Sequence, residues 1–191
     1  MRKSKSIIES ADLQNYFYLN LSDLNKKSLC PVPEEMIYYS STVMEKFSVS
    51  GNFFDVSNGK VQEKVLGIKM LEASQKSSLE QKRILRDVGD TALLVSGYFS
   101  NSVNTKILNV SYYIQLGQMA YDRLNTLSPE LLNIPSFYRL MATSFENLTT
   151  LIRVMSKSNE SDPFKHLLLE DHDDNGLKCM GILPTKTDKV S

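Results

Sequence analysis

The stretch Arg83-Ile-Leu-Arg-Asp-Val-Gly-Asp-Thr-Ala-Leu-Leu-Val-Ser-Gly-Tyr-Phe99 decides the fold class that this sequence predicts. Its apolar side chains recur at intervals of three or four residues, at Ile84, Val88, Ala92, Val95 and Phe99. This spacing places one apolar stripe along a helix. The same period recurs through most of the chain, and no alternation of period two is long enough to predict a sheet. The sequence therefore predicts an all-α protein.

Proline and glycine residues divide the rest of the chain into further helices. We expect a first helix around residues 13–24, a second after Pro33, a third over 60–75 behind the turn signal Asn58-Gly59, a fifth after Asn104 and a sixth over 136–157. A short extended segment near 49–54 is compatible with the pattern, but no sheet is expected. The expected architecture is an irregular bundle of about six helices, with the fourth and fifth at its centre. We expect residues 8–158 to form a single domain and residues 159–191 to form a polar, weakly ordered tail.

The composition of the chain argues against several classes of function. Twenty-two basic residues balance twenty-two acidic ones, so no net charge attracts the chain to nucleic acid or to a membrane surface. Between Pro31 and Lys165 there is no histidine and no cysteine. The common general base, the thiolate nucleophile and the usual ligands of zinc, haem and iron–sulfur clusters are thus missing from the expected core. We expect no cofactor, and the missing groups favour a non-enzymatic protein while leaving carboxylate, tyrosine, serine, threonine, lysine and arginine chemistry open.

The amino-terminal sequence and the two cysteines bear on location. Met1-Arg-Lys-Ser-Lys5 is basic, but Ile7-Ile8 is followed by Glu9, so no apolar signal segment develops. The longest apolar runs are far shorter than the roughly 20 residues that span a bilayer. Two distant cysteines suit a reducing compartment. We expect a soluble, cytoplasmic protein.

Asp87 and Asp90 form an Asp-x-x-Asp pair on one face of the predicted fourth helix. Such a pair can hold Mg²⁺ and, with Arg83 or Arg86, a phosphorylated ligand. The arginines also precede the two aspartates by four residues, so that ion pairs within the helix can satisfy both carboxylates. No second acidic cluster that would complete a metal site follows. We favour the structural interpretation and keep the magnesium site as the alternative.

Tyrosines concentrate in the predicted central helices, at Tyr98, Tyr112, Tyr113 and Tyr121. They either line a polar pocket for a small molecule, in which Tyr98, Tyr112 and Tyr113 orient the ligand, or belong to the core with their hydroxyls at its rim. A buried tyrosine hydroxyl needs a hydrogen-bond partner, and Asp87, Asp90, Asn101 and Asn104 are the candidates.

Glycines also recur in these helices, at Gly89, Gly97 and Gly117. A glycine inside a helix costs about 1 kcal/mol relative to alanine. We expect close contacts between the fourth and fifth helices at these positions, with a ligand groove as the alternative.

The segment Asp171-His-Asp-Asp-Asn-Gly176 matches the first half of an EF-hand loop. The bidentate glutamate of the twelfth position is replaced by Ile182, and Pro184 opposes a following helix. His166, His172 and Cys179 match no standard metal-site spacing. An acidic tail is the favoured interpretation.

The elements Arg86-Asp-Val-Gly-Asp90, Ser96-Gly-Tyr-Phe99 and Val110-Ser-Tyr-Tyr-Ile-Gln-Leu-Gly117 resemble an uncharacterised family of small helical bacterial proteins. The resemblance implies a bacterial, cytoplasmic helical domain, and it implies no activity, cofactor or catalytic residue.

Two functions are therefore expected from different classes. The first is a non-enzymatic binding or regulatory module that acts through a protein partner or as a homodimer. The alternative is a magnesium-dependent enzyme or sensor for a phosphorylated small molecule, in which Asp87 and Asp90 hold the ion.

Overall fold

The computed structural model describes the backbone of residues 6–48, 54–57, 60–63, 65–100, 109–127 and 137–158, and side chains from residue 13 onward except in 54–57 and 60–63. The described helices are α1 (Ser6–Lys26), α2 (Glu34–Ser48), α3 (Leu66–Ala73), α4 (Ser78–Gly97), α6 (Val110–Leu127) and α7 (Phe137–Ser158). Two strands, β1 (Phe54–Ser57) and β2 (Lys60–Glu63), lie between α2 and α3 in the sequence. The predicted all-α fold class is confirmed.

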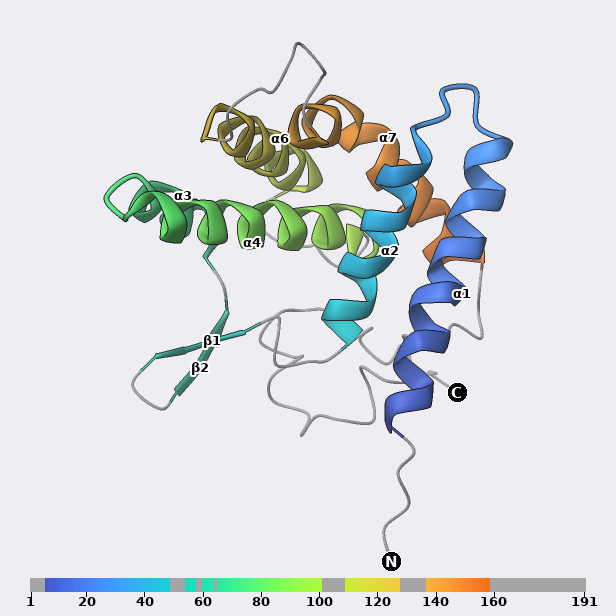
Figure 1. The fold of residues 1–191 in the computed structure, drawn as a ribbon, viewed down its shortest axis with the longest axis horizontal. Coiled ribbons are helices and arrows are strands. Elements are labelled where there is room, and N and C mark those ends of the chain that lie inside the picture. Colours follow the sequence, from blue (N-terminus) through green and yellow to red (C-terminus); the bar gives the residue numbers. More distant parts are fainter. Residues whose placement is uncertain are drawn as a thin grey trace, which may run out of the picture.

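Helix α4 forms the centre of the bundle, as its sequence predicts. It packs against α6, α7, α3 and α2, whereas α1 and α2 form an antiparallel pair that contacts α7 (Figure 1). A capping box starts α4, because the Ser77 hydroxyl accepts from the Glu80 amide and the Glu80 carboxylate accepts from the Ser77 amide. Every residue of α4 from Val88 to Gly97 is buried. A helix buried on all sides over this length belongs to the middle of a core.

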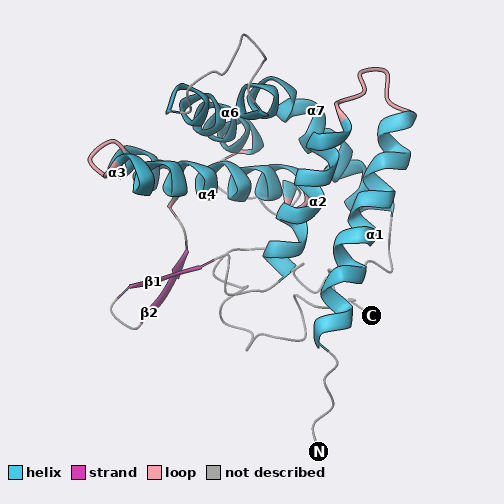
Figure 2. Ribbon diagram, viewed as in Figure 1, coloured by secondary structure: helices cyan, strands magenta, loops and turns pink. Residues whose placement is uncertain are grey.

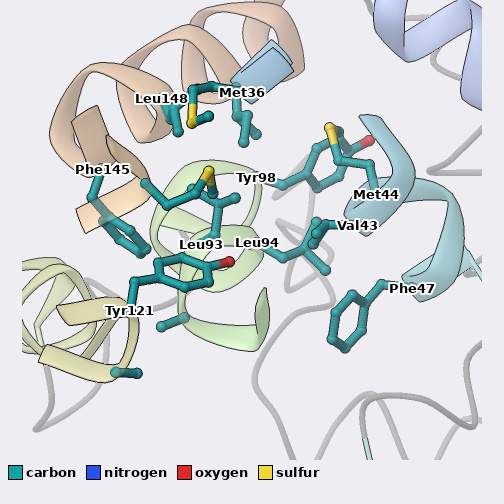
Figure 3. Close-up of a cluster of buried hydrophobic side chains, with 14 of the residues drawn as sticks. Met36, Val43, Met44, Phe47, Leu93, Leu94, Tyr98, Tyr121, Phe145 and Leu148 are labelled. Atoms are coloured by element: carbon teal, nitrogen blue, oxygen red, sulfur yellow. The ribbon is translucent and has the colours of Figure 1, made fainter. Parts of the chain in front are cut away.

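The core joins side chains from all of the larger helices. Figure 3 shows one part of it, where Leu93 and Leu94 of α4 lie among side chains from α2, α6 and α7. The largest fully buried side chains include aromatic residues from four helices: Phe17, Phe47, Tyr121 and Phe145. Each such side chain contributes about 1.5–3 kcal/mol by leaving water, so this core holds the bundle together.

The prediction for residues 60–75 is wrong in its first part. Residues Lys60–Glu63 form β2, which pairs antiparallel with β1, and the helix begins only at Leu66 (magenta and cyan in Figure 2). The register places Val56 opposite Val61, a pair of β-branched residues that favours strands. Asn58-Gly59 stands between the two strands, and this dipeptide is a strong hairpin signal. The helical spacing of Val61, Val65 and Ile68 was the weaker signal.

The connection between α1 and α2 is fixed by one side chain near the end of α1. The Asn25 amide donates to the Val32 carbonyl at 2.8 Å, and its carbonyl oxygen accepts from the Val32 amide at 2.9 Å. These two hydrogen bonds replace the backbone partners that Val32 lacks outside a helix. They thereby fix where α2 starts relative to α1.

The glycines of α4 and α6 are points of close contact with other helices. A Cβ atom at Gly89 would lie 2.8 Å from the Tyr121 ring of α6, and one at Gly117 would overlap the Phe145 ring of α7. A Cβ atom at Gly97 would lie 2.8 Å from Ile152, also on α7. Close contact is thus observed at all three positions. The predicted partner is right only for Gly89, because Gly97 and Gly117 face α7.

Several predictions concern residues outside the described part of the chain. These are the polar tail over 159–191 with its half EF-hand loop, and the cluster of His166, His172 and Cys179. The domain limits of 8–158 also stay a prediction. No helix in the described ranges combines the length and apolar character needed to cross a membrane.

Candidate functional site

Asp90 lies at a junction of three helices. Its carboxylate is buried, with 2% of the residue exposed, and one oxygen accepts hydrogen bonds from the hydroxyls of Tyr39 at 2.6 Å and Tyr121 at 2.9 Å. The other oxygen lies 3.2 Å from the Lys46 ammonium. Tyr39 and Lys46 belong to α2 and Tyr121 to α6. The predicted pairing of a central tyrosine with this aspartate is therefore observed for Tyr121.

Asp87 lies one helical turn before Asp90 and also pairs with lysines. Its carboxylate is 3.3 Å from the Lys69 ammonium of α3 and 3.9 Å from that of Lys46. Lys46 thus lies between the two aspartates, and the two lysines balance the two carboxylates. These partners come from other helices, whereas the sequence predicted ion pairs within α4. The Asp-x-x-Asp pair connects α4 to α2 and α3.

The surroundings of Asp90 keep the hydroxyls of Tyr39 and Tyr121 protonated, so that both can donate hydrogen bonds. Burial raises the pKa of the Tyr121 phenol well above its ordinary value, and the nearby Asp90 carboxylate raises it further. The same two causes raise the pKa of Tyr39. Both hydroxyls therefore stay protonated and donate to Asp90, which is how a buried carboxylate is stabilised.

The two predicted arginines differ in their surroundings. The Arg86 guanidinium donates to the Tyr138 hydroxyl at 2.6 Å and lies 5.8 Å from the centre of the Tyr138 ring. The Tyr138 ring in turn stacks on Tyr121, with ring centres 6.2 Å apart. Arg83 is exposed on the outer side of α4. Arg86 is thus tied into the tyrosine cluster, and Arg83 lies at the surface.

The three other predicted site tyrosines do not converge on Asp87 and Asp90. Tyr98 is buried at the end of α4 and points toward the Met44 side of α2 (Figure 3). Tyr112 is half-buried on α6 with its hydroxyl against Gly67 of α3. The Tyr113 ring packs edge-on against Tyr112, with centres 5.4 Å apart. These tyrosines therefore line different contacts between helices and not one pocket.

The described residues contain no group of three or more histidine, cysteine or acidic side chains that could hold a metal ion. Asp87 and Asp90 supply two carboxylates, and lysine ammonium groups occupy positions next to both. A divalent cation there would have to displace or oppose these ammonium groups. The arrangement suits an internal ion-pair network better than a magnesium site.

A pocket of about 480 Å³ opens at the surface where α1, α2 and the start of α7 meet. Its walls consist of four aromatic side chains and two glutamates: Tyr18, Tyr38, Tyr39, Phe137, Glu34 and Glu35. Tyr18 and Tyr38 are inclined at 72° with ring centres 6.1 Å apart, and Tyr39 and Phe137 at 73° with centres 5.0 Å apart. The pocket thus has aromatic walls and an acidic rim.

Hydrogen bonds fix two of these walls. The Tyr18 hydroxyl donates to the Glu34 carboxylate, and this hydrogen bond raises the pKa of Tyr18. Tyr39 contributes its ring to the pocket while its hydroxyl is held by Asp90. Tyr38 is 58% exposed, although its ring also contacts that of Tyr18. The ion-pair network below the pocket therefore positions one wall, and the exposed Tyr38 offers a free contact surface.

The pattern of the sequence does not by itself predict this pocket. A signal was present in Glu34-Glu35 and Tyr38-Tyr39, because residues four apart in a helix lie side by side. The contributions of Tyr18 and Phe137 had no local signal, since they come from two other helices.

Comparisons of the chain with known protein families, with curated proteins and with solved structures find no match. The resemblance to small helical bacterial proteins accordingly stays an expectation, and the function has to be argued from the geometry.

Proposed function

We propose that this protein is a non-enzymatic binding or regulatory module of the cytoplasm that acts through contacts with a protein partner or with a second copy of itself. The observation that carries the proposal is the open pocket of Tyr18, Tyr38, Tyr39 and Phe137 with its glutamate rim. Exposed aromatic side chains are enriched at sites of protein recognition, where they bury a large area with little loss of side-chain freedom.

The arrangement of charged groups supports a binding role over catalysis. Asp87 and Asp90 are each paired with lysines, and Asp90 also accepts from two tyrosines. A general base or a metal ligand needs a lone pair directed at the substrate or ion. Here the lone pairs of Asp90 are directed at groups of the protein itself. The magnesium-dependent alternative would require this network to open, and no contact in the described residues favours it.

A recovery experiment with matched variants tests the proposal. Full-length tagged protein is incubated with lysate of its source cells, and self-association is followed by light scattering. We expect Tyr38→Ala to reduce recovery of the partner, or dimerisation, roughly tenfold, as loss of a central aromatic contact does. Met119→Ala removes a side chain that is 55% exposed on α6, away from the pocket, and serves as the control with unchanged binding.

Two observations together would contradict the proposed binding function. The wild-type protein would be a monomer at high concentration with no partner recovered. Nucleotides or diphosphates with Mg²⁺ would raise its melting temperature, and Asp90→Ala would abolish that rise. This combination would replace the binding module with the magnesium-dependent alternative.

A further inference from the structure

The pocket between α1, α2 and α7 has a chemical character that narrows its ligand. Its lining contains four aromatic rings and two carboxylates, and among the described residues no lysine or arginine lines it. The faces of aromatic rings carry partial negative charge, and the glutamates carry full negative charge. The two carboxylates and the aromatic rings of the lining therefore favour a cation over an anion.

The inclination of the rings fits a cation with apolar substituents. In each aromatic pair the two rings meet at a steep angle, 72° for Tyr18 with Tyr38 and 73° for Tyr39 with Phe137. Within each pair the two rings thus stand as walls at a steep angle to each other. A quaternary ammonium group can touch several such rings at once, and because its hydration is weak it loses little on leaving water.

The protein already uses the same chemistry in contacts between its own residues. The Lys46 ammonium lies 5.1 Å from the centre of the Phe47 ring, and the Arg86 guanidinium lies 5.8 Å from that of Tyr138. Tyr138 follows Phe137 directly and their rings pack edge-on. Arg86 is held by its hydrogen bond to the Tyr138 hydroxyl and does not line the pocket, so the glutamates remain the charged groups of the lining.

We propose that the pocket lined by Tyr18, Tyr38, Tyr39 and Phe137, with Glu34 and Glu35 at its rim, binds a methylated ammonium group. The inference rests on the proposed binding function and specifies what its pocket recognises. In a partner protein the group would be the side chain of a methylated lysine, which is long enough to enter an open pocket from a facing surface. Glu35 then offers a carboxylate to the cation, while Glu34 also holds Tyr18 in place.

A titration with matched probes tests the charge requirement. Choline and its neutral isostere 3,3-dimethylbutan-1-ol have the same shape, and each is added to the full-length protein while amide NMR signals are recorded at constant ionic strength. We expect choline to shift the signals of residues 34–39 and to bind about tenfold more tightly than the isostere. Equal binding of the two probes, or no shift with choline, would overturn the inference.

Variants test which side chains bind the cation, and a peptide probe tests whether the cation belongs to a protein side chain. Tyr38→Ala should weaken choline binding roughly tenfold and Glu35→Gln several-fold, with Met119→Ala unchanged. A capped pentapeptide with a central trimethyllysine should bind more tightly than choline if the source is a protein side chain. If the peptide binds no more tightly than choline, the free cation is the source. The two proposals can also fail separately. If Tyr38→Ala abolishes recovery of the partner but choline does not bind, the pocket binds a protein without recognising a methylated ammonium group. That result would reject this inference and keep the proposed function.

Discussion

Gly117→Leu is expected to lower the free energy of unfolding by more than about 3 kcal/mol, at the upper end of the cost of overpacking a core. Even the first added carbon would overlap the Phe145 ring, and Phe145 is fully buried, so that its ring has no free space to move into. Three further carbons would separate α6 from α7. Urea unfolding followed by circular dichroism measures the change.

A second glycine provides the control for this experiment. Gly67 of α3 faces only the hydroxyl end of the half-buried Tyr112 side chain, which can move aside. Gly67→Ala should therefore change the unfolding free energy by no more than about 1 kcal/mol, since alanine also favours the helix. If Gly117→Leu unfolded at the same urea concentration as the wild type, Gly117 would not be a helix contact, and a ligand groove would become the better explanation.

Asp90→Ala is expected to destabilise the protein by about 1–3 kcal/mol, the usual cost of leaving a buried hydrogen-bonding group without its partner. The substitution removes the acceptor of the Tyr39 and Tyr121 hydroxyls and the partner of Lys46. Tyr121 is fully buried, so its hydroxyl would have no water to replace the lost hydrogen bond. Thermal and urea unfolding of the variant measure the loss.

Two further substitutions, Asp90→Asn and Asp87→Ala, show which interaction contributes most to stability. Asp90→Asn keeps one acceptor oxygen for the tyrosines but removes the charge next to Lys46, so an intermediate loss is expected. Asp87→Ala should cost less than Asp90→Ala, because 26% of the Asp87 side chain is already exposed. A variant Asp90→Ala that is more stable than the wild type would indicate a carboxylate kept for function at the expense of stability.

The sequence predicts the helical class and the central position of α4 because burial leaves a direct trace in apolar spacing. The run from Val88 to Phe99 has few charged residues, and the structure buries it on all sides. The helical spacing misleads at residues 60–63, because Val61 suits both a helix and a strand. There the antiparallel pairing with β1 decides the structure, and apolar spacing within residues 60–75 carries no information about that pairing.

The candidate site is only partly predictable, because most of its contacts join residues that are far apart in the sequence. The Asp87–Asp90 pair and a central tyrosine partner follow from positions within two predicted helices. The other partners of Asp90 are 44 and 51 residues away in the sequence, at Lys46 and Tyr39. Their approach depends on how α2 crosses α4, which apolar spacing does not determine. The aromatic pocket depends on three helices at once, so its residues become a group only in the folded chain.

One NMR experiment tests the central claim, that Asp87 and Asp90 hold the helices together while the aromatic pocket binds the ligand. The full-length protein is titrated with MgCl₂ and, in a second sample, with choline chloride at the same ionic strength. Choline is expected to shift the amide signals of residues 34–39, and Mg²⁺ is expected to leave those of residues 86–91 unchanged. Saturable shifts at residues 86–91 with Mg²⁺, together with no response of residues 34–39 to choline, would contradict this claim.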